Sequence, residues 1–97
     1  MERESEMKRM HAIARGRVQG VCFRMYVRDQ AEALGVRGWV RNCPDGSVET
    51  VAEAAPETLA DFAERLRSGS PWSRVESLTR EERNPTGEFD SFTIRYG

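Results

Sequence analysis

Two stretches of the chain carry apolar side chains at three- and four-residue steps. In the first stretch these residues are Phe23, Val27, Ala31 and Leu34. Such spacing puts the four side chains on one face of a helix, and Gly35 follows where a left-handed residue commonly ends a helix. The pattern therefore predicts a helix over residues 23–34.

The second stretch lies between a proline and a glycine. Pro56 suits the first turn of a helix, because that position needs no backbone N–H donor. The apolar residues that share one helical face after it are Leu59, Phe62 and Leu66. Gly69 and Pro71 then end the pattern, which predicts a second helix between Pro56 and Gly69.

Shorter apolar runs predict five strands, over 10–18, 36–41, 47–53, 74–80 and 89–96. The last strand shows the clearest alternation, with Phe92, Ile94 and Tyr96 at every second position. Between the second and third strands, the sequence Pro44-Asp45-Gly46 has the composition of a tight turn. The second and third strands are therefore expected to form an antiparallel hairpin.

The order of these elements predicts an α+β fold. Strand, helix, strand, strand, helix, strand is the order of the ferredoxin-like split βαβ sandwich, here with one additional C-terminal strand. Both helices then cover one face of an antiparallel-rich sheet, and the opposite face is more exposed. Charged residues expected among the apolar ones of the strands are Glu49, Glu53, Glu76 and Arg80. We expect a single domain over 10–97, preceded by a charged, flexible extension over 1–9.

Composition excludes several classes of function. The 97 residues include 15 basic and 16 acidic side chains, so the chain lacks the basic excess of a protein that binds nucleic acid. No apolar run approaches the roughly 20 residues needed to span a bilayer, and the charged start does not resemble a signal peptide, which favours a cytoplasmic protein. Cys22 and Cys43 lack the spacing of a zinc site and are expected to be free thiols. No metal site is predicted.

The most informative segment runs from Gly16 to Arg24, which leaves a strand, turns at Gly20 and enters the first helix. Backbone N–H groups in such a turn have no sheet or helix partner, and the helix terminus adds a partial positive charge. Arg24, in the first helical turn, can close on a bound anion with its fork of donors. By spacing alone, a tight turn with a solvated arginine explains this segment equally well.

Two motifs also resemble those of a known family. Gly16-Arg17-Val18-Gln19-Gly20-Val21-Cys22-Phe23-Arg24 resembles the first signature of the acylphosphatases, and Gly38-Trp39-Val40-Arg41-Asn42, with Gly46 and Val48, resembles the second. The resemblance extends over about residues 10–96. It departs from the family pattern at Ala54, where glycine is common.

The resemblance implies a metal-independent acylphosphatase that needs no cofactor and hydrolyses a small acyl phosphate to a carboxylate and inorganic phosphate. It implies that Arg24 binds the phosphate, that Asn42 positions the attacking water, and that backbone N–H groups form a phosphate-binding loop. The residues of that loop are Arg17, Val18, Gln19, Gly20, Val21, Cys22 and Phe23. Inorganic phosphate or sulfate should compete for the loop. We expect a monomer that binds neither nucleic acid nor membrane.

Other hypotheses remain open at this point. A module of the same fold could bind phosphate or a carbamoyl-phosphate-like ligand without hydrolysing it. An RNA-binding module of similar topology would need exposed aromatic residues on its central strands and a basic rim, and neither is evident. His11, the single histidine, lies on a predicted strand without a recognisable catalytic partner, so it is not predicted to be a general base.

Overall fold

A computed structural model describes residues 6–96. Within this range the chain forms five strands and two helices, with the bounds β1 Lys8–Arg17, α1 Phe23–Leu34, β2 Arg37–Asn42, β3 Val48–Ala54, α2 Pro56–Ser68, β4 Arg74–Arg83 and β5 Phe92–Arg95. The predicted order of elements is confirmed. Residues 1–5 of the expected flexible extension, and Gly97, lie outside the described residues.

Both helices have the bounds that the sequence predicts, because their ends are encoded locally. Gly35 adopts a left-handed conformation with φ of 74°. After it the chain folds back, and the Val36 backbone N–H donates to the carbonyl of Ala31 at 2.8 Å. Helix α2 starts with Pro56 in its first turn and ends before Gly69, where φ is 76°. The apolar residues of the predicted faces are buried, except Leu34, which is partly buried against the core.

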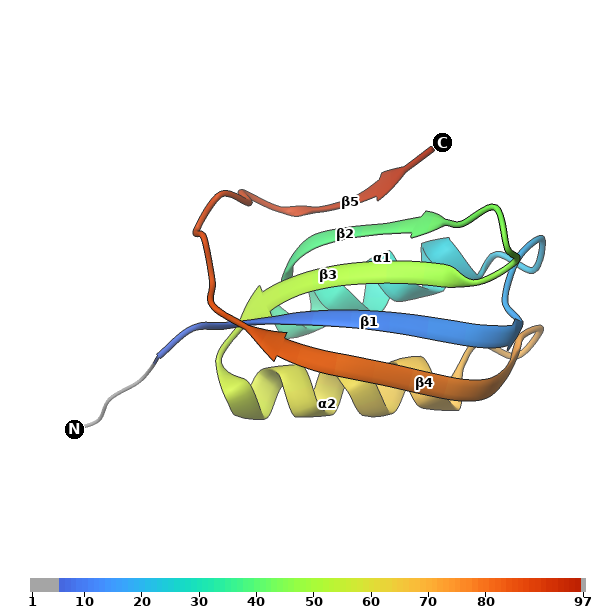
Figure 1. The fold of residues 1–97 in the computed structure, drawn as a ribbon, viewed down its shortest axis with the longest axis horizontal. Coiled ribbons are helices and arrows are strands. Elements are labelled where there is room, and N and C mark those ends of the chain that lie inside the picture. The colour runs from blue at the N-terminus through green and yellow to red at the C-terminus, as the bar shows by residue number, and fades with distance from the viewer. Residues whose placement is uncertain (1–5, 97) are drawn as a thin grey trace.

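The strands form one sheet in the order β4-β1-β3-β2-β5. Strands β2 and β3 form the predicted antiparallel hairpin, and β1 pairs antiparallel with both β3 and β4. Only β5 runs parallel to its neighbour, β2. Figure 1 shows α1 and α2 on the same side of this sheet. The protein therefore has the α+β, ferredoxin-like fold.

The hydrophobic core lies between the helices and one face of the sheet. Met10 and Ala12 of β1 point into this core. Because side chains alternate along a strand, the residues in register with them on neighbouring strands lie on the same face of the sheet. Phe62 of α2 meets Phe92 of β5 edge to face, with ring centroids 5.8 Å apart. Tyr26 of α1 donates its hydroxyl to the carbonyl of Arg65 in α2 at 2.8 Å, which joins the two helices. The largest fully buried side chains are Phe23, Phe62, Met10, Leu66, Val18, Val27, Val40 and Val48.

The opposite face of the sheet is polar, but the structure corrects two expectations about it. Glu53 is only 3% exposed, because the segment between β4 and β5 crosses over it. Its carboxylate accepts from Arg9 Nε at 2.8 Å and from the backbone N–H groups of Thr86 at 2.8 Å and Gly87 at 3.0 Å. We call Arg9, Glu53, Thr86 and Gly87 the Glu53 clasp. Arg80 is not on the polar face either. It is in register with the core residue Ala12 and therefore shares the face of Ala12, at the exposed edge of the sheet.

Strand ends differ from the predicted ones by at most three residues. Strand β1 begins at Lys8, so Lys8 and Arg9 belong to the sheet and not to a flexible extension. Strand β4 continues to Arg83, beyond its predicted end. Strand β5 is shorter than predicted at both ends, and Phe89 lies instead against Arg9, whose guanidinium carbon is 5.0 Å from the ring centroid.

Candidate active site

Two loops meet at one end of the molecule. The loop over residues 18–22 leaves β1 and enters α1, and the loop over residues 43–47 joins β2 to β3; both are at the right-hand end in Figure 1. A pocket of about 340 Å³ opens beside them. Its lining residues are Val18, Gly20, Cys22, Phe23, Arg24, Met25, Asn42, Ile94 and Tyr96. Residues distant in sequence therefore share one cavity.

The loop over residues 18–22 has the backbone of an anion cradle. Gly20 and Cys22 both have left-handed backbone, with φ of 73° and 61°. Among the described residues, the backbone N–H groups of 19–22 donate to no protein acceptor, and no side chain caps the start of α1. Consecutive free N–H groups in such a turn attract an anion, and the partial positive charge of the helix terminus adds to that attraction.

Cys22 reaches its left-handed conformation without glycine's freedom. Among residues 6–96, Cys22 is the one residue other than glycine that has a positive φ. A side chain in this region usually costs about 1–2 kcal/mol, and such strain is often found at functional sites. Cys22 is exposed, and both it and Cys43 are free thiols. The strained backbone of Cys22 is consistent with an anion cradle at this loop, because the turn into α1 sets the shape of that cradle.

Arg24 lies in the first turn of α1 and reaches across the pocket mouth towards β5. Its Nη1 donates to the carbonyl of Arg95 at 3.5 Å, a long contact, and its guanidinium carbon lies 4.8 Å from the Tyr96 ring centroid. No carboxylate of residues 6–96 forms an ion pair with it. The remaining guanidinium donors are thus available to an anion in the cradle.

Asn42 is the last residue of β2 and pairs with Val48 of β3. Its Oδ1 atom is buried and accepts no hydrogen bond from any described residue. A buried polar atom without a partner usually costs about 1–3 kcal/mol. Because no donor holds the oxygen, rotation about the broad terminal torsion of the amide can turn it to the pocket. The amide is thus available to a ligand or a water molecule.

The turn that follows Asn42 is held by its own polar groups. Asp45 Oδ1 accepts from the Ser47 hydroxyl at 2.6 Å and from its backbone N–H at 3.0 Å. These Ser47 hydrogen bonds, together with one from Arg15, hold the pKa of the Asp45 carboxyl well below its usual range. The Asp45 carboxylate therefore stays ionised over the physiological pH range and keeps its hydrogen bonds to Ser47.

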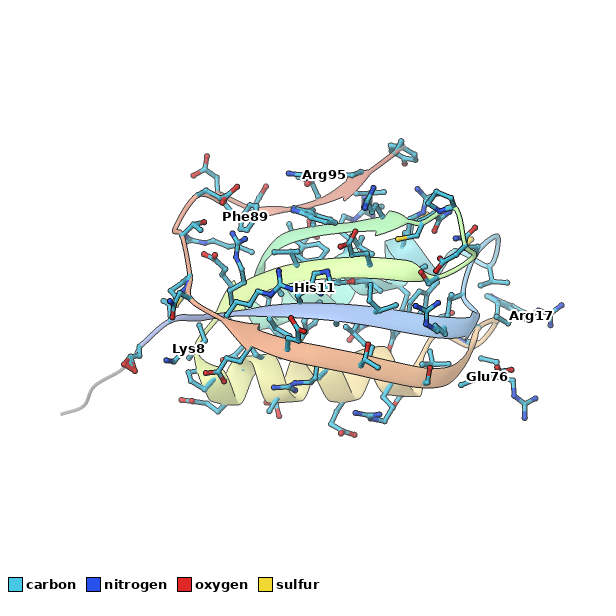
Figure 2. The ribbon with its side chains drawn as sticks, viewed as in Figure 1. Lys8, His11, Arg17, Glu76, Phe89 and Arg95 are labelled. Atoms are coloured by element: carbon cyan, nitrogen blue, oxygen red, sulfur yellow. The ribbon has the colours of Figure 1, made fainter. Side chains whose placement is uncertain are left out.

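The structure brings most of the predicted site residues together. Of the nine, the six that line the pocket are Val18, Gly20, Cys22, Phe23, Arg24 and Asn42. Arg17 does not line it: Arg17 ends β1 in register with Arg74, and Figure 2 shows its side chain pointing away from the body of the protein. Val21 packs against the core, and Gln19 turns its side chain towards the other loop.

His11 lies apart from the pocket. It is on the outer face of the sheet, labelled in Figure 2, and its Nε2 is 2.6 Å from Glu49 Oε2. Arg41 donates to the other oxygen of Glu49 at 2.6 Å. Burial of the Glu49 carboxyl raises its pKa, but the hydrogen bonds from His11 and Arg41 outweigh that effect and lower the pKa. This group is a bridge between strands.

Three pocket residues were not predicted from the sequence. Met25, Ile94 and Tyr96 give the pocket an apolar side, and Met25 and Tyr96 are exposed large apolar residues, at 50% and 78%. The alternation of Phe92, Ile94 and Tyr96 had indicated a strand, but not which side of it faces a pocket. The sequence signal that could have identified Met25 as a pocket residue is its position directly after Arg24.

Within residues 6–96, no three His, Cys, Asp or Glu side chains gather into a group able to hold a metal ion. In the same range, no helix is long and apolar enough to cross a membrane.

Fold and pocket together define an α+β domain with a loop of free backbone N–H groups at a helix start, and comparisons identify its family. The family model described as Acylphosphatase matches residues 10–94, so the chain belongs to the acylphosphatase family. It is 47% identical over 90 residues to an acylphosphatase of Bacillus velezensis, covering 93% of this chain and 100% of that protein. It is 45% identical to one of Syntrophobacter fumaroxidans, covering 95% of each.

A solved structure agrees with this assignment. The crystal structure of acylphosphatase from Bacillus subtilis superposes with a TM-score of 0.88 at 37% identity, covering 92% of this chain and 99% of that one. The resemblance noted in the two motifs is thus confirmed at the level of the whole domain.

Proposed function

We propose that this protein hydrolyses acyl phosphates to a carboxylate and inorganic phosphate. The free backbone N–H groups of residues 19–22, within the predicted loop over residues 17–23, and the guanidinium of Arg24 hold the phosphoryl group, and Asn42 orients the attacking water. The proposal is supported by family membership and by relatives named acylphosphatase. The observation that carries the chemistry is the Asn42 Oδ1 atom, which accepts from no described residue, in a pocket shared with Arg24 and the cradle.

The reaction needs one displacement at phosphorus. The water oxygen forms a bond to phosphorus as the bond from phosphorus to the acyl oxygen breaks, and the carboxylate leaves with that electron pair. The Asn42 oxygen accepts from the water while its NH₂ group donates to a phosphate oxygen, which fixes an in-line approach. The proton lost by the water ends on a phosphate oxygen of the substrate.

The pocket suits a leaving group that needs no proton. Its lining residues include no carboxyl and no imidazole, and His11 lies on the outer face of the sheet. A carboxylate leaves unprotonated at neutral pH, because the pKa of its acid is near 4. An alkoxide needs an acid or a metal ion to share its charge. Arg24 and the cradle stabilise the transferring phosphoryl group.

We also propose where the acyl group binds and in which state the protein acts. The apolar side made by Met25, Ile94 and Tyr96 would receive the acyl group. The protein would act as a cytoplasmic monomer, without metal, cofactor or nucleic acid, and with inorganic phosphate or sulfate as competing anions. Size-exclusion chromatography with light scattering tests the monomer, and a stable dimer would contradict it.

Release of phosphate from acetyl phosphate and benzoyl phosphate by the purified protein tests the activity. We expect turnover in excess chelator, with competitive inhibition by phosphate and sulfate. Activity that chelator removes and magnesium restores would overturn the metal-independent mechanism. Binding of phosphate without turnover would instead favour the non-catalytic binding module of the same fold.

A further inference from the structure

The side chain of Gln19 connects the two loops of the site. Its neighbours Val18 and Gly20 line the pocket, whereas the Gln19 side chain reaches the turn between β2 and β3. There Nε2 donates to the backbone carbonyl of Cys43 at 2.8 Å and to that of Ser47 at 2.8 Å. One amide group from the cradle thus holds both ends of the turn that follows Asn42.

The two carbonyls also close the turn itself. The backbone N–H of Cys43 donates to the Ser47 carbonyl at 2.9 Å, and that of Gly46 donates to the Cys43 carbonyl at 3.1 Å. Each carbonyl therefore accepts one bond from the turn and one from Gln19. Since a primary amide has two N–H donors on one nitrogen, Gln19 satisfies both acceptors at once. A side chain without these donors would leave one lone pair on each of the two carbonyls unpaired.

A second link to the turn between β2 and β3 is an exposed ion pair from β1. Arg15 Nη1 pairs with Asp45 Oδ2 at 3.1 Å, and both side chains are 55% exposed. Exposed ion pairs contribute little, because water and salt screen them and both long side chains must be ordered. Gln19 is only partly exposed and bonds to backbone atoms, so it constrains the turn more strongly than Arg15 does.

We propose that Gln19 is a positioning residue, which sets the place of the Asn42 amide relative to the phosphate cradle. The inference rests on the proposed function, because it gives Asn42 the task of orienting water. Asn42 pairs with Val48 at the end of the β2–β3 ladder, directly before the turn that Gln19 holds. A shift of the turn therefore moves Asn42, while the free N–H groups of 19–22 remain in the cradle.

The test is the variant Gln19→Met, which has a similar length but no donor, with Arg15→Met as the matched control on the exposed link. We expect Gln19→Met to lower kcat about 10- to 100-fold, because a misplacement of about 1 Å can have an effect of that size. The inhibition constant of inorganic phosphate should change less than about threefold, and Arg15→Met should match the wild type.

A double-mutant cycle distinguishes positioning from general damage. In the Asn42→Ala background the water-orienting group is absent, so Gln19→Met should lower kcat by less than about threefold there. An equal loss of kcat in both backgrounds would overturn the proposal, as would wild-type kcat in Gln19→Met or a parallel rise in the phosphate inhibition constant. Thermal unfolding of each variant confirms that the assay temperature lies below the transition.

A measurement independent of turnover keeps this inference separate from the proposed function. In ¹⁵N-labelled protein, Gln19→Met should shift the side-chain amide signals of Asn42, and Arg15→Met should not. If the wild type hydrolysed no acyl phosphate, the proposed function would fail, and the spectra would still decide whether Gln19 positions Asn42. Unchanged Asn42 signals in Gln19→Met would overturn the inference.

Discussion

Glu53 and Asn42 present buried oxygen atoms at opposite ends of the β2–β3 ladder, and their surroundings differ. Glu53 accepts from Arg9, Thr86 and Gly87 within 3.0 Å. Asn42 Oδ1 accepts from none of the described residues. A satisfied buried carboxylate fixes the path of the chain, whereas an unsatisfied amide reduces stability and remains free to bind. The Glu53 end of the sheet therefore contributes to stability, whereas the Asn42 end keeps a polar group free for the proposed chemistry.

The largest effect is expected from Arg24→Ala at the site end. The charge that holds the phosphoryl group would be lost, so kcat/KM for benzoyl phosphate should fall by about 10³-fold or more. Arg24→Lys should restore little, because a lysine cannot form the same bidentate contact. Arg28→Ala, one turn further along α1, is the control and should keep its activity. Full activity in Arg24→Ala would refute the assignment of the phosphate site.

Asn42→Ala should lower kcat by about 10²–10³-fold, the usual effect of removing one preorganised polar group. The inhibition constant of phosphate should hardly change. Because the buried Oδ1 atom has no partner to lose, the free energy of unfolding should not fall, and it should rise by up to the roughly 1–3 kcal/mol that an unsatisfied polar atom costs. Weaker phosphate inhibition in step with the lower kcat would mean that Asn42 is a ligand-binding or structural residue.

Glu53→Ala should have the opposite outcome, with lost stability and retained chemistry. It leaves Arg9 and two backbone N–H groups without their acceptor, and breaking such a buried pair costs about 3 kcal/mol. Urea denaturation measures this loss. Glu81→Ala, which removes an exposed ion pair with Arg83, should cost far less. A kcat of folded Glu53→Ala below that of Asn42→Ala would remove the distinction between the two ends.

A smaller effect concerns pH. Burial raises the pKa of the Glu53 carboxyl, but hydrogen bonds from Thr86, Arg9 and Gly87 together outweigh it and lower the pKa. A carboxyl with a lowered pKa stabilises the fold above its unfolded pKa of about 4.3, and that stabilisation is lost as pH falls through the folded value. The difference in unfolding free energy between wild type and Glu53→Gln should therefore shrink from pH 6 to acid. A difference independent of pH would contradict the clasp.

Local signals made the helices and the hairpin predictable. Gly35, Pro56 and Gly69 mark helix ends by their own backbone requirements, and both helices have the predicted bounds. Strand β4 is an exposed edge strand in which apolar and polar residues alternate little. The sequence pattern therefore does not predict its extension to Arg83. The burial of Glu53 depends on a crossover that passes 33 residues away in sequence from it, and no local pattern encodes such a contact.

The candidate site was predictable to a similar extent. Arg24 and Asn42 came from two motifs, and the pocket contains both. The motif predicts the cradle residues only as backbone donors, so the role of the Gln19 side chain is not predicted from the sequence. Its partners, Cys43 and Ser47, become neighbours only when the two loops meet in the folded chain. Motifs identify residues that touch a ligand more readily than residues that hold those residues in place.

The most direct test of the account compares kcat/KM for benzoyl phosphate with kcat/KM for an alkyl phosphate, at neutral pH and in excess chelator. The pocket holds the phosphoryl group and the water but has no carboxyl or imidazole to protonate a leaving oxygen. We predict a preference for the acyl phosphate of at least about 1000-fold, within the range that a general acid contributes. Comparable values for the two substrates would contradict the proposed mechanism, because they would require an acid in the pocket, such as the Cys22 thiol or the Tyr96 phenol.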